Sequence, residues 1–219
     1  MNNNRSNWDS HWGEESQREY WQEPAGEIIK LKDSLDRQKV RDVLDLGCGI
    51  GRHAILFAES GFTVTAVDDS RKALDILQEN AYEKQVVITC LKGSYGKEIF
   101  SEDSFDLVIA YNVLYHGYRD DFDRSIKLVY KYLRPGGLFF FTCPTRQDAK
   151  YGNGEKVRVN TYRSLNSVHP GDIHYFANED DIACFLRDFT GYRVEREEHF
   201  WENNNVMQFS SNWHILAKK

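Results

Sequence analysis

The sequence has no long hydrophobic run, no excess of positive charge and few cysteines. No apolar stretch approaches the ~20 residues that a membrane span needs. Lys and Arg total 28 against 34 Asp and Glu, so the formal net charge is −6 and no basic excess indicates nucleic-acid binding. Residues 1–5 lack the apolar core of a signal peptide. We therefore expect a cytoplasmic protein that binds neither a membrane nor nucleic acid.

The cysteines are also too widely spaced to form a recognisable pattern. Cys48, Cys90, Cys143 and Cys184 match neither a disulfide framework nor a zinc motif, and we expect buried thiols in a reducing compartment. A chain of 219 residues is long enough to bury a substantial core. We expect one domain over residues 1–219.

One stretch organises the interpretation of the rest. Residues 39–46 contain a short apolar run typical of a buried strand, and residues 54–58 begin a helical pattern. Gly47, Gly49 and Gly51 stand between them. A strand, a glycine turn and a helix form the first half of a βαβ unit, in which glycine lets a ligand lie directly against the backbone.

The charge near this turn indicates which ligand it binds. A dinucleotide fingerprint has the spacing G-x-G-x-x-G, but here Arg52 occupies the place of its third glycine. Asp45, two residues before the first glycine, would repel a pyrophosphate but would hold an ammonium group. S-adenosylmethionine carries an amino group and a sulfonium and no phosphate, so the pattern favours it over NAD or FAD.

The D-x-G-x-G-x-G sequence from Asp45 to Gly51 resembles the first motif of the class I S-adenosylmethionine-dependent methyltransferases. The sequence is most similar to the small-molecule enzymes of the type 11/12 and tellurite-resistance-like groups, over roughly residues 40–219. The resemblance implies an α/β fold: a Rossmann-like, seven-stranded, mostly parallel sheet with helices on both faces and an antiparallel C-terminal hairpin. It implies S-adenosylmethionine as cofactor, bound in part by Cys48 of the glycine turn.

An acidic residue is expected to hold the ribose of the cofactor. Asp68 ends the predicted strand 62–67, about 20 residues beyond the glycines, where a carboxylate accepts hydrogen bonds from both ribose hydroxyls. The alternative role, as N-cap of the next helix, fits Asp69 or Ser70 better. Asp69 is kept as a further cofactor contact.

Four more cofactor contacts follow the third and fourth predicted strands. Ser94 stands where the family often has an Asp that accepts from the adenine amino group, and Tyr95 is expected to stack on the adenine. Tyr111 and Asn112 resemble the segment of the family that faces the methionine part of the cofactor. In open α/β sheets these strand ends flank the ligand-binding crevice.

The first 40 residues are interpreted as an N-terminal helical cap. They are polar but contain Trp8, Trp12, Tyr20 and Trp21, so part of the segment should pack on the body. The resemblance implies helices that close over the cofactor, and we expect Tyr20 and Trp21 to line the site. For Trp8 and Trp12, packing on the sheet edge is an equally good explanation.

Residues 144–176, here called the insertion, have little regular pattern and are expected to form a substrate lid. The insertion carries five cations, which fit either an anionic acceptor or an ordinary solvated loop: Arg146, Lys150, Lys156, Arg158 and Arg163. His169 and His174 do not predict a metal site, because Pro170 and Gly171 prevent a helix that would align them and we expect no Cys or third His to lie near.

No residue is a certain catalyst in the sequence, although His116, His174 and Tyr175 are candidates for a base or a substrate contact. The expected function is transfer of a methyl group from S-adenosylmethionine to a small-molecule acceptor by in-line displacement, in a monomer or homodimer. A non-catalytic S-adenosylmethionine-binding protein, acting as a sensor or partner subunit, is the alternative.

Overall fold

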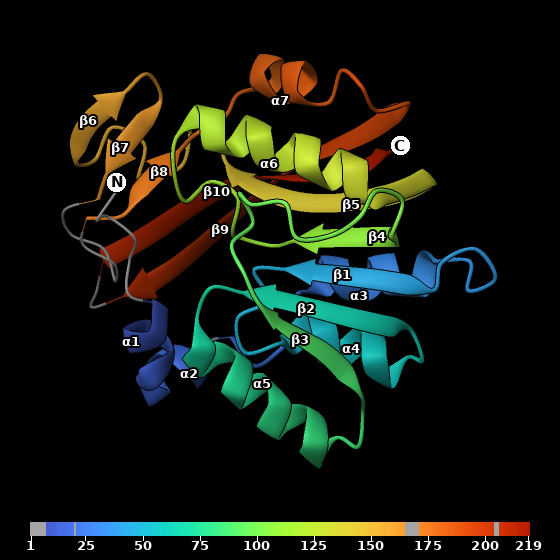
Figure 1. Cartoon of the computed structure of the whole chain (residues 1–219). Coiled ribbons are helices and arrows are strands. Elements are labelled where there is room, and N and C mark those ends of the chain that lie inside the picture. The colour runs from blue at the N-terminus through green and yellow to red at the C-terminus, as the bar shows by residue number, and fades with distance from the viewer. Residues whose placement is uncertain (1–7, 20, 165–170, 204–205) are drawn as a thin grey trace.

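The structure is a computed structural model that describes residues 8–19, 21–164, 171–203 and 206–219. A seven-stranded sheet forms its centre, and a smaller three-stranded sheet lies at one end (Figure 1). The strands of the large sheet, in spatial order, are β3 (Ile88–Lys92), β2 (Thr63–Asp68), β1 (Asp42–Leu46), β4 (Phe105–Ala110), β5 (Leu133–Pro144), β10 (Val206–Lys218) and β9 (Gly191–Asn203). Pairing is parallel from β3 to β5 and antiparallel for β10 and β9, which confirms the predicted fold.

Strand β1 marks the point where the strand order reverses. It pairs in parallel with β2 on one side and β4 on the other, so Asp45 lies opposite Ala66 and Ile109. The connections that leave β1 and β4 run to opposite faces of the sheet. They separate at the carboxyl ends of these strands, and open α/β sheets bind ligands at such a point.

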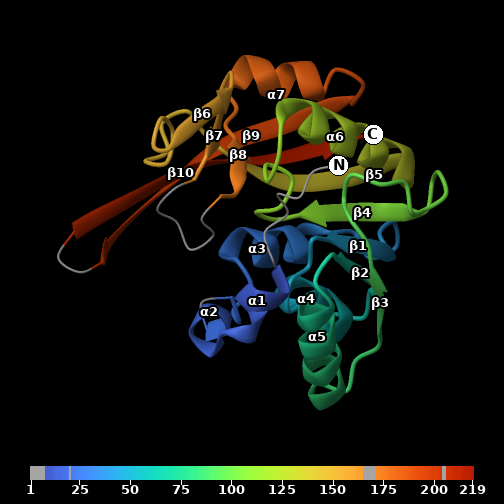
Figure 2. The ribbon, with the colours of Figure 1, turned by 60° about the vertical axis from the view of Figure 1, so that its left-hand side comes forward.

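Helices cover both faces of the sheet (Figures 1 and 2). They are α1 (Trp8–Gly13), α2 (Glu15–Glu19), α3 (Gly26–Ser34), α4 (Arg52–Glu59), α5 (Arg71–Glu83), α6 (Arg119–Tyr132) and α7 (Glu179–Phe185). Side chains alternate along β4: Val108 and Ala110 join the apolar cluster that includes α6 and α7, whereas Leu107 and Ile109 join the cluster that includes α3, α4 and α5. Burial on both faces explains the nearly continuous apolar strands. None of the helices in the described ranges has both the length and the apolar character that crossing a bilayer requires.

The terminal hairpin is much longer than the sequence predicted. Strands were expected only at residues 192–196 and 211–217, but β9 and β10 each have 13 residues. Only Asn212 to Lys218 of β10 pair with β5, so the distal part of the hairpin extends beyond the sheet (Figure 2). The distal strands carry large apolar residues, such as Phe200, Trp201 and Met207, but not in the alternation by which half-buried strands are recognised.

The insertion is also more regular than expected. It contains the antiparallel strands β6 (Glu155–Arg158), β7 (Thr161–Arg163) and β8 (Ile173–Tyr175). An isolated bridge from His174 to His116 joins this sheet to the body, and a second one, between Thr145 and Ala177, brings the two ends of the insertion together. The prediction of a largely irregular loop was wrong, because strands of three or four residues carry too little periodicity to detect.

Helix α1 packs against α5 and supplies part of that helix's capping. The Asp9 carboxylate accepts hydrogen bonds from the Ser70 hydroxyl (2.6 Å) and the Lys72 N–H (3.1 Å). Ser70 is itself the N-cap of α5, in agreement with one of the two predicted caps, and accepts from the Ala73 N–H. All four cysteines are free thiols, but Cys184 is exposed, contrary to the expectation of burial.

Candidate active site

A crevice of about 700 Å³ lies at the carboxyl ends of β1, β2 and β4. Its size is within the ~300–1,000 Å³ typical of small-molecule sites. Most of the predicted cofactor residues line it: Trp21, Asp45, Gly47, Cys48, Gly49, Asp68, Asp69, Tyr95, Tyr111 and Asn112. Gly51 and Ser94 are not among the lining residues, and Tyr20 lies outside the described residues.

Gly51 has a packing function rather than a place in the crevice wall. It is the N-cap of α4 with φ of +86°, and a Cβ there would lie 2.0 Å from Cδ1 of Leu77. The third glycine thus lets α4 and α5 approach each other. Gly49 differs because a Cβ at that position would meet the Trp12 ring, 2.8 Å away, so Trp12 covers the turn from the crevice side.

Asp45 is buried at the base of the crevice, with 2% of its surface exposed. One carboxylate oxygen accepts a hydrogen bond from the Ala54 N–H (3.0 Å) and so satisfies a backbone donor of α4 that Gly51, without a side chain, does not cap. Burial raises the pKa of Asp45 to about 7. A ligand ammonium group beside this carboxylate would lower that pKa again.

Asp68 is held from both sides at the end of β2. Its Oδ2 accepts a hydrogen bond from the Gly49 N–H and its Oδ1 accepts one from the Ser70 N–H, both at 2.8 Å. Burial raises the pKa of Asp68. Each carboxylate oxygen has two lone pairs, so both oxygens keep the capacity to accept from a hydroxyl in the crevice.

The segment after β4 is fixed by polar contacts to β5 and α3. Asn112 adopts φ of +56°, its N–H donates to the Thr142 hydroxyl, and that hydroxyl donates to the Asn112 Oδ1, each at 2.8 Å. The Tyr111 hydroxyl donates to Glu27 at 2.7 Å. Left-handed backbone at a non-glycine residue is uncommon, and it turns this segment toward the crevice.

Tyr95 links two of the strand ends. Its hydroxyl donates a hydrogen bond to the carbonyl oxygen of His116, so the segments after β3 and β4 are joined. Ser94, the predicted adenine contact beside it, instead accepts from the Lys97 N–H through its carbonyl in a local turn. Gly93 also lines the crevice near Tyr95, where backbone atoms are exposed to a ligand.

The N-terminal aromatics contribute more than predicted. Trp21 lines the crevice as expected, with the Arg52 guanidinium 4.8 Å from its ring centroid. For Trp8 and Trp12, packing on the sheet edge was an equally good expectation from the sequence. These two tryptophans also line the crevice, together with His11. Their W-x-x-H-W pattern places all three on one short helix, but only the docking of α1 on α5 aims them at the crevice.

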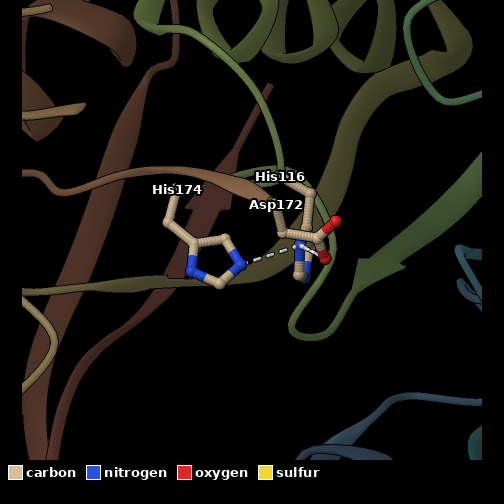
Figure 3. Close-up of side chains that lie close together, drawn as sticks. All are labelled: His116, Asp172 and His174. Atoms are coloured by element: carbon tan, nitrogen blue, oxygen red, sulfur yellow. Dashed lines mark hydrogen bonds and ion pairs between the residues drawn. The ribbon is translucent and has the colours of Figure 1, made fainter. Parts of the chain in front are cut away.

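Two of the three catalytic candidates meet in the lining of the crevice. Nε2 of His174 lies 3.1 Å from Nδ1 of His116, and Oδ2 of Asp172 lies 3.9 Å from the same Nδ1 (Figure 3). The expectation that no further His lies near His174 was wrong, because β8 docks on the segment after β4. Asp172 was not predicted, although its alternation with His174 along a strand was a usable signal.

Tyr175, the third candidate, points the other way. It is fully buried in the core cluster with Phe122 and Phe185, because successive residues of β8 face opposite sides. Burial strongly raises the pKa of its hydroxyl. The structure does not bring Tyr175 to the crevice, so the suggestion that it contacts substrate is corrected.

The basic residues of the insertion are mostly paired. Arg146 forms an ion pair with Asp181 (2.7 Å), Arg163 with Glu155 (3.0 Å), and Arg158 with Asp120 (3.4 Å). Among the five predicted cations, only Lys150 lines the crevice. Most of these five basic residues are therefore explained as part of an ordinary charged surface loop.

Comparison with known proteins agrees with this geometry. The family described as "Methyltransferase domain" matches residues 43–137. The chain is similar to the ubiquinone biosynthesis O-methyltransferase of Coxiella burnetii (strain Dugway 5J108-111), with 31% identity over 192 residues that cover 78% of this chain and 79% of that protein. The protein of the same description from Rickettsia akari is 25% identical over 169 residues, 74% of this chain and 65% of its own length.

Two further proteins, one a curated relative and one a solved structure, are also similar to the chain. The tRNA N(3)-methylcytidine methyltransferase of Schizosaccharomyces pombe is 25% identical over 199 residues, and the match covers 83% of this chain and 63% of that protein. Among solved structures, a SAM-dependent methyltransferase from Methanosarcina mazei superposes with a TM-score of 0.71 at 18% identity, over 90% of this chain and 98% of its own. The chain thus spans just under two thirds of some of its relatives.

Proposed function

The chain belongs to the class I S-adenosylmethionine-dependent methyltransferases, and we propose that it transfers the methyl group of S-adenosylmethionine to a small-molecule acceptor. The observation that carries the proposal is one crevice lined by two groups of residues. Asp45, Asp68 and the glycine turn line it, and so do His116 and His174. We place the cofactor at the first group, called the cofactor end, and the acceptor at the second, called the acceptor end. A cofactor and an acceptor bound in one such space would have their reacting atoms adjacent.

The cofactor end offers the groups that S-adenosylmethionine needs. We place the ribose hydroxyls on Asp68, the amino group near Asp45 and the adenine between Gly93 and Tyr95. Asp68 is already oriented by two backbone N–H groups, so little ordering is required when the ligand binds. Asp69, Cys48 and the ring of Trp21 would complete the contacts.

Catalysis would depend mainly on alignment. A lone pair of the acceptor forms the new bond to the methyl carbon, and the electron pair of the breaking C–S bond returns to sulfur, which leaves S-adenosylhomocysteine. Holding two reactants in line supplies up to ~7–11 kcal/mol in well-oriented cases. A hydroxyl acceptor must also lose its proton, and His116 and His174 are the groups in reach of that end of the crevice.

A small aromatic acceptor with a hydroxyl group fits the remaining walls. Trp8, Tyr115, Tyr162 and Phe176 line the acceptor end, and flat rings pack well on such surfaces. Helix α1 and the insertion cover this end, and we propose that they act as the cap and the lid. A formal net charge of −6 and the pairing of Arg146, Arg158 and Arg163 give little support for a nucleic-acid acceptor.

Calorimetry followed by a methyl-transfer assay tests this function. We expect micromolar binding of S-adenosylhomocysteine, no binding of NADH, and transfer of labelled methyl from S-adenosylmethionine to a member of a panel of phenols and catechols. Binding without transfer to any small acceptor would favour the alternative of a non-catalytic sensor. Transfer to RNA but to none of the small acceptors would overturn the choice of acceptor.

A further inference from the structure

Three potential metal ligands converge at the acceptor end of the crevice. One potential ligand atom each from His116, Asp172 and His174 lies within 4.8 Å of the other two, and His174 and Asp172 both approach the His116 ring (Figure 3). Ligand atoms ~2.1 Å from a tetrahedral ion lie ~3.4 Å apart. The 3.1 Å and 3.9 Å separations from Nδ1 of His116 bracket that value, and the remaining pair, His174 and Asp172, lies within 4.8 Å. We propose that these three residues bind a first-row divalent transition-metal ion such as Zn²⁺.

The backbone holds the three residues in this arrangement. Asp172 immediately precedes β8, and His174 lies two positions later within it, so extended backbone puts both side chains on one face. The Tyr175 N–H donates to the Tyr115 carbonyl at 3.0 Å, which fixes the register between β8 and the segment that carries His116. The Asp172 carbonyl accepts from the Ser164 N–H at 2.8 Å.

Packing around His116 restricts its ring. The Tyr115 ring stacks on it at a centroid distance of 4.5 Å, and the edge of Trp8 meets it at 5.1 Å. The carbonyl oxygen of His116 accepts a hydrogen bond from the Tyr95 hydroxyl. A ligand held by its surroundings loses little entropy when it coordinates an ion, and such outer contacts tune metal affinity.

The way in which His174 and Asp172 approach the His116 ring fits a bound metal ion better than a proton relay. Both His174 and Asp172 approach the same nitrogen of His116, Nδ1, whereas a relay uses the two nitrogens of an imidazole in series. One Nδ1–H directs its hydrogen toward one acceptor only. A cation placed between the three atoms would satisfy a lone pair from each.

The ligand types and burial select the class of ion. Two imidazoles disfavour Mg²⁺ and Ca²⁺, which prefer oxygen, and favour Zn²⁺ or Fe²⁺. The carboxylate neutralises part of the ion's charge, and Asp172 and His174 are 5% and 8% exposed. Catalytic sites with three protein ligands keep a further position for water or substrate, and here His116 and His174 face the crevice.

The role of the ion rests on the proposed methyl transfer. An acceptor hydroxyl bound to the ion would release its proton to water at a lower pH, because a bound Zn²⁺ lowers the pKa of its water to ≈ 7. The resulting oxygen then attacks the methyl carbon while sulfur takes the C–S electron pair. The two histidines would act as ligands in this scheme, and neither would accept the proton.

Metal analysis of the full chain tests the site directly. After treatment with EDTA and removal of the chelator, the protein is titrated with Zn²⁺ by calorimetry, and Co²⁺ is added separately for its visible absorption. We expect one equivalent of Zn²⁺ and a Co²⁺ spectrum of low-symmetry nitrogen–oxygen coordination. His174→Ala and Asp172→Asn should each weaken Zn²⁺ binding by more than roughly 100-fold, the upper effect of losing an outer-shell partner.

His199→Ala is the matched control, because His199 is an exposed histidine of β9 outside the crevice lining. It should bind Zn²⁺ like the unaltered chain. Equal binding by His174→Ala, or no binding by the unaltered chain, would overturn the metal site. Titration of the same samples with S-adenosylhomocysteine separates the two proposals: cofactor binding without Zn²⁺ binding removes only the metal, and Zn²⁺ binding without cofactor binding removes the methyl transfer.

Discussion

The Oδ2 atom of Asp68 accepts a hydrogen bond from the Gly49 N–H at 2.8 Å, which ties the end of β2 to the turn that follows β1. Asp68 therefore stabilises the glycine turn as well as facing the crevice. Because the same carboxylate is proposed to bind the ribose, its two functions can be separated only by measuring stability and cofactor affinity together.

Replacing this carboxylate tests the ribose assignment. Asp68→Ala should weaken binding of S-adenosylhomocysteine by roughly 1.5–3 kcal/mol, the range for hydrogen bonds to a charged group. Calorimetric titration measures this loss, and thermal unfolding shows whether the variant is folded. Asp75→Ala, on the exposed side of α5, is the control and should bind normally. Unchanged affinity in folded Asp68→Ala would contradict the assignment.

The packing role of the third glycine is tested at Gly51. Gly51→Ala should lower the free energy of unfolding by roughly 2–5 kcal/mol, since it adds left-handed strain to an overlap with Leu77. Gly152→Ala has a similar φ of +79° and open space, so only the strain of about 1–2 kcal/mol should remain. Urea unfolding of both variants gives the comparison. Equal losses would show that contact with α5 does not matter.

The buried Asp45 should make stability depend on pH. Its pKa is about 7 in the folded protein and about 3.9 in the unfolded chain, so between these values only the folded state keeps the proton. The contribution of Asp45 to the free energy of unfolding therefore falls as the pH rises from about 4 to about 7. Asp45→Asn does not titrate, and its stability relative to the unaltered chain should rise by roughly 2–4 kcal/mol between about pH 4 and about pH 8.

Urea unfolding of both proteins at several pH values checks this expectation. In the same variant, affinity for S-adenosylhomocysteine should decrease, because the amide cannot pair with the ammonium group. A stability difference that stays constant with pH would contradict the raised pKa of Asp45. Unchanged cofactor affinity would contradict its proposed contact.

The orientation of β8 predicts opposite results for two neighbours. Tyr175→Phe removes a buried hydroxyl that forms no hydrogen bond within the described residues, so it should change stability by less than about 1 kcal/mol and leave methyl transfer within about twofold. His174→Ala removes a group that faces the crevice and should lower methyl transfer at least tenfold. Kinetics with an accepted substrate and unfolding by urea measure both. A loss of activity in folded Tyr175→Phe would contradict the assignment of its side chain to the core.

Local signals in the sequence were sufficient for the parallel strands of the large sheet and for the residues at their ends that line the crevice. The apolar strand before Gly47, the acidic end of β2 and the cap at Ser70 each depend on residues close together in the chain. Such features follow from backbone geometry and from hydrogen bonding between near neighbours. For this reason the positions of Asp45 and Asp68 in the crevice could be predicted.

Only the tertiary structure decided which side chains line the crevice together with Asp45 and Asp68. His116 and His174 are 58 residues apart, and Trp8 reaches the ring of His116 from the N-terminal helix. These contacts depend on the docking of α1 and β8, which is driven by burial and by a few backbone hydrogen bonds that leave no periodic trace in the sequence. The chain's own pattern thus determined the acidic and glycine residues at the strand ends that line the crevice, whereas the packing of distant segments determined which side chains join them there.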